Sequence, residues 1–221
     1  MKNAYVIMTR IPVAGKTKTR MMPNLNGEQC AELHSCLLKD LFKTTDALKD
    51  EIDIFVAYSN EGNINLLTSI APKFIKLFPQ QGNNLGEKMN NAINYLLNIG
   101  YDKVVLTGSD IPNISSDIIE NSFLYLNNWD IVIGSTYDGG YYLIGCSESI
   151  DDILLSPISW GQETVFQHTL TIIHNKNKNY KLIEPLQDID TIEDLLNFKK
   201  SSIDNSYTLD FINNIKASSK K

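Results

Sequence analysis

The stretch "VVLTGSDIPN", residues 104–113, begins as an unbroken apolar run and ends in small and polar residues around one carboxylate, Asp110. An unbroken run of aliphatic and β-branched residues is typical of a strand that is buried on both faces. Such strands occur where helices cover both faces of a mostly parallel sheet. The stretch therefore predicts a central strand of an α/β protein, with Asp110 at its carboxyl end.

The rest of the chain repeats this alternation of strand and helix. Strand-like runs rich in Val, Ile, Phe and Tyr occupy residues 4–8, 52–58, 74–78, 103–108, 130–134 and 141–145. Apolar residues at helical spacing predict helices over residues 28–48, 89–97, 118–126 and 165–173, the first with a capping pair, Asn26 and Gln29. We expect an α/β fold with a mostly parallel mixed sheet and helices on both faces. Too few residues separate the last two runs for a crossover helix, so the sheet departs from parallel there.

The length and composition suit a globular protein. A chain of 221 residues with 43% hydrophobic residues is long enough for one domain, expected over residues 1–200. Residues 201–221 are expected to form a C-terminal extension with a short docked helix and a frayed tail. The three cysteines have no disulfide or metal spacing, so we interpret them as packed thiols.

Charge and the N-terminus limit the partners and the location. The first apolar run ends at Arg10, too soon for a signal peptide or a membrane span, so a cytoplasmic protein is expected. A net charge of −6 argues against a nucleic-acid polymer as the partner, because binding to its phosphates needs clustered cations. One local cationic cluster is nonetheless present.

This cluster follows the first predicted strand, in "TRIPVAGKTKTRMMP". Arg10, Lys16, Lys18 and Arg20 surround Gly15, which lets the backbone approach a ligand closely. Cations at alternate positions can converge on one anionic group, and phosphate is the ligand that suits them. The alternative interpretation is a solvated basic loop, and the spacing of a P-loop is absent.

Carboxylates near the predicted strand ends suggest a metal site. Asp110 stands at the carboxyl end of its strand, where ligands bind in open α/β sheets, and can ligate a divalent cation that bridges phosphates. Asp188 and Asp190 in "QDIDTIEDLL" can complete that site. Each has a structural alternative, because Asp110 precedes a proline turn, and Thr191 and Asp194 have the spacing of a capping box.

The segment "GSTYDGGYYLIG" joins the last two predicted strands. Asp138 stands at the bend, Gly139 and Gly140 permit unusual backbone torsions, and Tyr141 follows. A carboxylate beside aromatic rings suits a sugar or a base, although a plain hairpin would need only the glycines. The histidines, which are His34, His168 and His174, are interpreted as surface or packing residues.

Six segments resemble a known family in their order and spacing. They are "MTRIPVAGKTKTRMMPNL", "QQGNNLGEKMNNA", "LTGSDIPNIS", "DGGYYLIG", "SWGQETVF" and "DIDTIEDL". Together they resemble the bacterial glycosyltransferase-like family of radical-SAM/selenodomain-associated or arsenosugar-biosynthesis transferases, within the nucleotide-diphosphosugar transferase superfamily. The resemblance covers the chain to about Phe198. It implies a Rossmann-like GT-A fold, a nucleotide site and a divalent metal, Mg²⁺ or Mn²⁺.

The resemblance also implies roles for individual residues. It places phosphate binding on Lys16, Lys18 and Arg20, and metal binding on Asp110. It places the acceptor or sugar side at Asp138, Gly139, Gly140, Tyr141 and Trp160, with Asp138 and Asp110 as the catalytic carboxylates. Two departures stand out: Asn84 replaces an acid of the family pattern, and "GSD" is half of an Asp-x-Asp motif.

Two enzymatic chemistries fit this resemblance. The segments "PVAGKTKTRM" and "DIDTIEDL" also resemble nucleotidyltransferases, including phospholactate guanylyltransferases. We favour a glycosyltransferase that uses a nucleotide-diphospho sugar and a small-molecule acceptor, because the G-x-G-x-R start of pyrophosphorylases is absent. The alternatives are a nucleotidyltransferase that releases pyrophosphate from a nucleoside triphosphate and a non-catalytic nucleotide-binding module.

Overall fold

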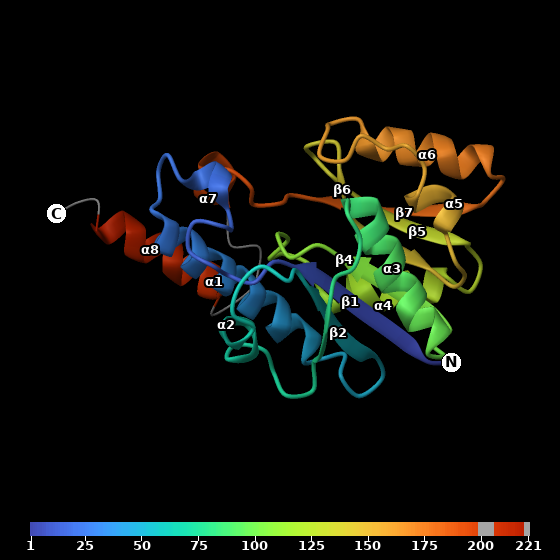
Figure 1. Ribbon diagram of the computed structural model, residues 1–221, viewed down its shortest axis with the longest axis horizontal. Coiled ribbons are helices and arrows are strands. Elements are labelled where there is room, and N and C mark those ends of the chain that lie inside the picture. Colours follow the sequence, from blue (N-terminus) through green and yellow to red (C-terminus); the bar gives the residue numbers. More distant parts are fainter. Residues whose placement is uncertain (199–205, 219–221) are drawn as a thin grey trace.

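The computed structural model describes residues 1–198 and 206–218 of the chain. It is an α/β fold with one seven-stranded sheet (Figure 1). The strands are β1 (Asn3–Thr9), β2 (Asp53–Tyr58), β3 (Lys76–Pro79), β4 (Lys103–Thr107), β5 (Ile131–Thr136), β6 (Tyr141–Cys146) and β7 (Tyr180–Leu186). The longer helices are α1 (Gly27–Thr45), α3 (Leu85–Asn98), α4 (Ser116–Tyr125), α6 (Val165–Asn175) and α8 (Tyr207–Ser218). Shorter helical segments are η1 (Thr19–Met21), α2 (Asn65–Thr68), α5 (Asp151–Leu154) and α7 (Ile192–Asn197).

The sheet is mixed but mostly parallel. Its strand order is β3-β2-β1-β4-β6-β5-β7, and β6 runs antiparallel to both of its neighbours, whereas the other pairs are parallel. The turn between β5 and β6 is too short for a crossover helix, so the two strands must run in opposite directions. The predicted departure from a parallel sheet is therefore confirmed at this place.

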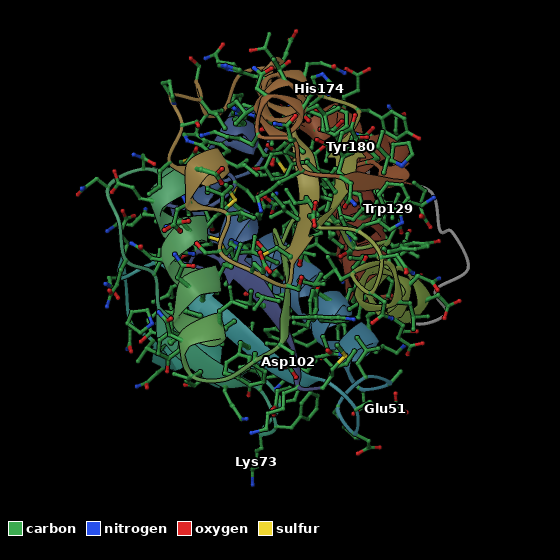
Figure 2. The ribbon with its side chains drawn as sticks, turned by 90° about the vertical axis from the view of Figure 1, so that its right-hand side faces the viewer. Glu51, Lys73, Asp102, Trp129, His174 and Tyr180 are labelled. Carbon is green, nitrogen blue, oxygen red and sulfur yellow. The ribbon has the colours of Figure 1, made fainter. Side chains whose placement is uncertain are left out.

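Side chains that alternate along the strands fill two cores, one on each face of the sheet. On β1, Tyr5 and Ile7 pack with α1 and α4, whereas Ala4 and Val6 pack with α3, α5 and α6. Figure 2 views the sheet from the side, with α3 and α4 on opposite sides of it. Both faces of the central strands are thus buried, which explains their unbroken hydrophobicity. The predicted layers are confirmed.

The first long helix begins where the sequence predicts. The side chain of Asn26 accepts from the backbone N–H of Gln29, and the Gln29 side chain accepts from the backbone N–H of Asn26, both at 2.9 Å. This reciprocal pair satisfies two backbone donors that the first turn leaves free. Helix α1 ends at Thr45, three residues before Leu48, which is buried within the turn that follows.

Strand β7 was not among the predicted elements. It lies at the edge of the sheet beside β5, and its residues "YKLIEPL" are mostly half-buried or exposed. It also contains Pro185, which cannot donate to a ladder and is tolerated in edge strands. A partly polar edge strand with a proline gives a weak sequence signal, which explains why it was missed.

The C-terminal helix α8 packs against α1, as Figure 1 shows. Asp40 of α1 is buried and accepts hydrogen bonds from the Ser206 hydroxyl and from the backbone N–H groups of Tyr207 and Thr208, at 2.8–2.9 Å. One carboxylate thereby caps the start of α8, while Phe211 and Ile212 are buried beneath it. Residues 207–218 thus form a helix that packs on α1. The frayed tail and the boundary at residue 200 lie outside the described residues, and the two-part division of the chain stays a prediction.

Among residues 1–198 and 206–218, we find no helix with the length and apolar character needed to cross a bilayer.

Candidate active site

The site lies at one edge of the sheet, where six strands end and β6 begins. Because β6 alone runs antiparallel, its amino end lies beside the carboxyl ends of β1, β4, β5 and β7. Residues 10–20, 108–115, 137–140 and 187–191 leave the sheet at this edge. They hold every predicted site residue except Tyr141 and Trp160. Ligands of open α/β sheets bind at such an edge.

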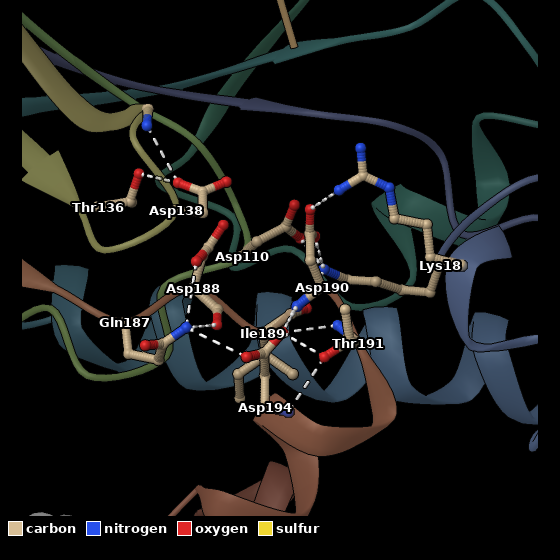
Figure 3. A network of polar contacts seen from close by, with 12 residues as sticks. Lys18, Asp110, Thr136, Asp138, Gln187, Asp188, Ile189, Asp190, Thr191 and Asp194 are labelled. Atoms are coloured by element: carbon tan, nitrogen blue, oxygen red, sulfur yellow. Dashed lines mark hydrogen bonds and ion pairs between the residues drawn. The ribbon is translucent and has the colours of Figure 1, made fainter. Parts of the chain in front are cut away.

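Lys18 lies at the centre of the polar network at this edge. Its backbone is left-handed, with φ of 50°, and its side chain is only 4% exposed. The ammonium contacts an Asp110 carboxylate oxygen at 2.6 Å, the Ile189 carbonyl at 2.5 Å and an Asp190 carboxylate oxygen at 3.2 Å (Figure 3). An ammonium has three N–H donors, so these contacts engage all of them. Lys18 therefore ties together three segments that are distant in sequence.

The charges of this network stabilise one another. Burial alone would lower the pKa of the Lys18 ammonium, but the attraction of Asp110 and Asp190 outweighs it and holds that pKa above its ordinary value. Burial raises the pKa of the Asp110 carboxyl. The attraction of Lys18 more than offsets this effect, so the pKa of Asp110 lies below its ordinary value. Both groups are therefore charged at neutral pH.

The other cations of the first loop have different surroundings. Arg10 donates to the backbone carbonyl of Lys16 at 3.0 Å, which folds the loop back on itself. Gly15 has φ of +75°, and a Cβ on Gly27 would lie 2.9 Å from the Gly15 nitrogen, so the loop and the start of α1 approach closely. The Lys16 side chain is exposed. Neither Gly15 nor Lys16 lines the two cavities described below.

Asp190 is fully engaged with cations. One carboxylate oxygen contacts Lys18, and the other accepts from Arg20 at 3.1 Å. The capping box that starts α7 uses different residues, Thr191 and Asp194, as the sequence alternative predicted. The helix cap and the ion pair therefore coexist on neighbouring residues.

The turn between β5 and β6 orients Asp138. One oxygen of its carboxylate accepts from the Thr136 hydroxyl at 2.5 Å and from the Gly140 backbone N–H at 3.1 Å. Gly139 has φ of +88°, and a Cβ there would collide with the carbonyl of Glu163. Glycine at this bend therefore lets the segment that carries Glu163 lie directly against the turn that carries Asp138.

Asp188 lies among like charges. Figure 3 shows its carboxylate beside those of Asp110, Asp138 and Asp190. Burial, followed by repulsion from Asp138 and Asp190, raises the pKa of Asp188 to about 7. Among the described residues, no three or more His, Cys, Asp or Glu side chains form a preformed metal site. The four carboxylates are thus near one another without enclosing an ion on their own.

We call the first of two neighbouring cavities the cationic cavity. It has a volume of about 550 Å³. Its charged lining comprises four cations and two carboxylates: Arg10, Lys18, Arg20, Lys88, Asp110 and Asp190. The rest of the lining includes Thr9, His34, Gln80, Leu85 and Ser109. This cavity has the excess positive charge that a diphosphate requires.

We call the second the acidic cavity. It has a volume of about 740 Å³. Its charged lining comprises three carboxylates and one cation: Asp138, Glu163, Asp190 and Arg20. Aromatic rings, glycines and one neutral polar side chain complete it, including Tyr137, Gly139, Gly140, Tyr141, Trp160 and Gln162. The two cavities share Arg20, Leu85 and Asp190, so they form one continuous site.

Sequence reasoning missed two ionisable residues of the cationic cavity, His34 and Lys88. His34 is buried, and one of its ring nitrogens is 2.9 Å from the Thr9 hydroxyl, while burial lowers its pKa to about 4. His34 is thus a packing residue, which is one of the two interpretations given for the histidines, but it also lines the site. Lys88 follows the start of α3 and faces the same cavity. No motif marked His34, whereas Lys88 lies within the segment "GEKMNNA" that carried the family resemblance.

Asn84, which replaces an acid of the family pattern, starts α3. Its side chain accepts from the Glu87 backbone N–H at 2.9 Å and so caps the helix.

In the acidic cavity, the sequence analysis did not single out Glu163, although it lies within the segment "SWGQETVF". Trp160 was predicted, and its ring is 6.3 Å from that of Tyr141, edge to face.

Known structures share this fold. A protein of Desulfovibrio desulfuricans G20, provisionally named a nucleotide-diphospho-sugar transferase, is 29% identical, with a TM-score of 0.88 over 98% of this chain and 96% of that one. A cytidylyltransferase from Leptospira borgpetersenii serovar Hardjo-bovis is 18% identical, with a TM-score of 0.62 over 100% of this chain and 96% of that one. A Mycobacterium tuberculosis H37Rv protein in complex with manganese is 12% identical, with a TM-score of 0.56 over 91% of this chain and 100% of that one.

Sequence comparison identifies the family. None of the curated proteins matches the chain. A family profile described as "Uncharacterized protein conserved in bacteria (DUF2064)" matches residues 43–162, more than half of the chain. The matched range includes Asp110, Asp138 and Trp160 of the site. The Rossmann-like GT-A fold implied by the sequence motifs is confirmed, and the chain belongs to the DUF2064 family.

Proposed function

We propose that this protein is a metal-dependent transferase that moves a sugar from a nucleotide-diphospho sugar to a hydroxyl group of a small molecule. The observation that carries the proposal is the pair of contiguous cavities at the carboxyl edge of the sheet, one cationic and one acidic. A donor needs positive charge around its diphosphate, and an acceptor needs a group that takes its proton. The two cavities supply these requirements side by side.

Within this proposal, phosphate binding falls on the cations that have donors to spare. All three N–H donors of Lys18 are engaged with the protein, so we assign the diphosphate to Arg10, Arg20 and Lys88, which also line the cationic cavity. Lys18 acts through Asp110 and Asp190, whose positions it fixes. Lys16 lies outside the cavity lining, and its part in phosphate binding stays a prediction that only a variant can test.

Asp110 and Asp188 fit a divalent cation. Both oxygens of Asp190 already contact cations, whereas Lys18 contacts only one oxygen of Asp110. Burial, followed by repulsion from Asp138 and Asp190, raises the pKa of Asp188, and a bound cation would offset both effects. Mg²⁺ is commonly held by one or two carboxylates, with phosphate oxygens and water completing its shell. When bound, the ion would stabilise negative charge on the departing diphosphate.

Asp138 is the group that we assign to the acceptor. Thr136 and Gly140 both donate to one of its oxygens, which directs the carboxylate and leaves the second oxygen for a substrate hydroxyl. The acceptor oxygen forms a bond to the anomeric carbon as the bond between that carbon and the β-phosphate oxygen breaks. The electron pair leaves with the nucleoside diphosphate, and the hydroxyl proton passes to Asp138.

Nucleotidyl transfer is the second candidate. The likeness of the whole chain to a structure named a cytidylyltransferase favours it. In nucleotidyl transfer, an acceptor attacks the α-phosphate of a nucleoside triphosphate and pyrophosphate leaves. The same cations and carboxylates would serve that reaction. The products distinguish the two candidates, because only sugar transfer releases a nucleoside diphosphate from a nucleotide sugar.

The first experiment therefore identifies products. The purified full chain is incubated with a panel of nucleotide sugars, and separately with nucleoside triphosphates plus phosphorylated acids or sugars, with Mg²⁺, Mn²⁺ or EDTA. We expect slow metal-dependent release of nucleoside diphosphate from one nucleotide sugar, with water replacing the missing acceptor. Pyrophosphate release without turnover of any nucleotide sugar would instead establish the nucleotidyltransferase.

A second experiment tests Asp138. Asp138→Asn keeps the shape of the side chain but removes its basicity, so we expect hydrolysis to fall by about 10²-fold or more while nucleotide binding is retained. The matched control is Asp50→Asn, in the exposed turn after α1, which should leave hydrolysis unchanged. Equal activity of the two variants would remove Asp138 from the mechanism.

A further inference from the structure

The charge of the acidic cavity is not compensated. Of its three carboxylates, Asp190 is paired with Arg20 at 3.1 Å. Within residues 1–198 and 206–218, the donors to Asp138 are the neutral Thr136 hydroxyl and Gly140 N–H. Glu163 is exposed and has no ion-pair partner in the described part of the chain. Two negative charges therefore remain beside a cavity whose one lining cation among the described residues, Arg20, has its charge paired with Asp190.

The neighbouring cationic cavity has the opposite balance. Its four cations outnumber its two carboxylates, and Arg10 and Lys88 do not belong to the Lys18 network. A bound divalent cation would not reverse this difference in charge between the two cavities, because the negative charges of the donor diphosphate would offset its two positive charges. A phosphate group is therefore attracted to the cationic cavity and repelled from the acidic cavity.

The remaining lining of the acidic cavity suits a polyhydroxylated ligand. Tyr137 is 68% exposed, and Tyr141 and Trp160 meet edge to face, so aromatic surface is available for the C–H face of a sugar ring. Carboxylates accept hydrogen bonds from hydroxyl groups but cannot donate to a phosphate or a carboxylate. Gln162 adds a neutral polar side chain.

Glu163 is held in place by the backbone rather than by its own side chain. The Gly139 carbonyl accepts from the Phe166 N–H at 2.9 Å, and Gly139 touches the Glu163 carbonyl directly. The segment with Glu163 is thereby fixed against the turn with Asp138. Because the Glu163 side chain is exposed and unpaired, changing it should alter charge without disturbing the fold.

We propose that the acidic cavity selects an acceptor without phosphate or carboxylate groups, an unphosphorylated sugar or similar polyol, and that Glu163 excludes anionic acceptors. This inference rests on the proposed function, because only a transferase has an acceptor. The charge selection itself concerns the cavity and can be measured without turnover. It also separates the two candidate reactions, because a nucleotidyltransferase acting on a phosphorylated acid or sugar must place an anion in this cavity.

Trp160 supplies a local probe of this charge. The chain has two tryptophans, so Trp129→Phe leaves Trp160 as the only indole. Fluorescence quenching by caesium, iodide and acrylamide is measured at constant ionic strength, with and without Mg²⁺ and pyrophosphate to fill the cationic cavity. Relative to N-acetyltryptophanamide, we expect caesium to quench Trp160 about twofold or more better than iodide. Equal or stronger quenching by iodide would overturn the proposal.

Variants locate the charge. In the same background, Glu163→Gln should reduce the preference for caesium, and Glu163→Lys should reverse it. Glu148→Gln is the matched control, because Glu148 is exposed and follows the opposite end of β6, and it should change nothing. An unchanged ratio in Glu163→Lys would show that Glu163 does not set the charge around Trp160, and would contradict the proposal.

Turnover tests the chemical class directly. With the nucleotide sugar that the wild type hydrolyses, glucose, glucosamine and glucose 6-phosphate are compared as accelerators of nucleoside diphosphate release. Greater acceleration by glucose 6-phosphate would overturn the proposal, whereas its improvement by about tenfold in Glu163→Lys would support it. If no nucleotide sugar is hydrolysed at all, the proposed function fails, while the quenching ratio still decides the charge selection.

Discussion

The cationic and acidic cavities share a wall but are built in different ways. Around the cationic cavity, side chains from distant segments are tied by ion pairs, with Lys18 contacting Asp110 and Asp190. In the acidic cavity, backbone contacts set the positions, with Gly139 touching the segment of Glu163. The stability of the cationic cavity therefore depends on charge, and so on pH. The stability of the acidic cavity depends on steric fit and should respond mainly to changes in side-chain size.

The largest expected effect breaks the ion-pair construction. Lys18→Met leaves Asp110, the Ile189 carbonyl and part of Asp190 without their buried donor, so we expect the free energy of unfolding to fall by about 4 kcal/mol in urea denaturation at pH 7. Lys16→Met is the control, because that side chain is exposed. It should cost less than about 0.5 kcal/mol. Similar small losses in both variants would refute the central role of Lys18.

A pH titration tests the same cavity at His34. Burial lowers the pKa of this histidine to about 4, so between pH 6.5 and 4 the unfolded chain binds a proton that the folded chain does not. The free energy of unfolding should therefore decrease as the pH is lowered from 6.5 to 4, by at most about 3 kcal/mol for this group. His34→Gln should lose less stability than the wild type over the window, whereas His174→Gln, at an exposed site, should behave like the wild type. Parallel pH profiles for all three proteins would contradict a buried neutral His34.

A shape change tests the acidic cavity. Gly139 and Gly100 both have positive φ, +88° and +95°, but a Cβ would collide with the Glu163 carbonyl only at Gly139 and would meet nothing within 4 Å at Gly100. Alanine at either position incurs the torsional cost. We expect Gly139→Ala to destabilise the protein by about 2 kcal/mol more than Gly100→Ala in thermal unfolding. Equal losses would mean that the contact with the Glu163 segment does not hold the cavity.

The smallest expected effect lies at Asp188, two residues before Asp190, which lines both cavities. The raised pKa of Asp188 means that the folded chain holds a proton more tightly than the unfolded chain, so stability decreases as the pH rises from about 4 to 7. With EDTA at pH 8, Asp188→Asn should be more stable than the wild type by about 1 kcal/mol, since solvent screens a half-buried group, and the gain should vanish near pH 4. Asp50→Asn should show no such gain. If Mn²⁺ stabilised Asp188→Asn as much as the wild type, Asp188 would not be a ligand.

Much of the fold could be predicted from the residues. The alternation of apolar runs and helical stripes located six of the seven strands and the helices α1, α3, α4 and α6. The capping pairs at Asn26 and Thr191 are local, so they could be recognised without the fold. Strand β7 could not, because an edge strand with half-exposed residues and a proline has little hydrophobic signal.

The candidate site was predicted in part. The phosphate loop, Asp110, the Asp138 turn and the Asp188–Asp190 segment all follow strand ends, and strand direction brings them to one edge. The roles within that edge were less accessible. Lys18 has the appearance of a free phosphate ligand in the sequence, but its partners lie about 90 and 170 residues away, beyond the reach of any local pattern.

The sequence by itself determined the class of fold, the reversal of direction at β6 and the residue types that gather at the carboxyl edge. These depend on periodicity, turn length and strand polarity, which are properties of short segments. Tertiary structure decided which cations remain available to a ligand, that His34 lines the cationic cavity, and that Glu163 lies beside Asp138. Such pairings depend on how sheet order and close packing bring distant segments together, and they set the charge of each cavity.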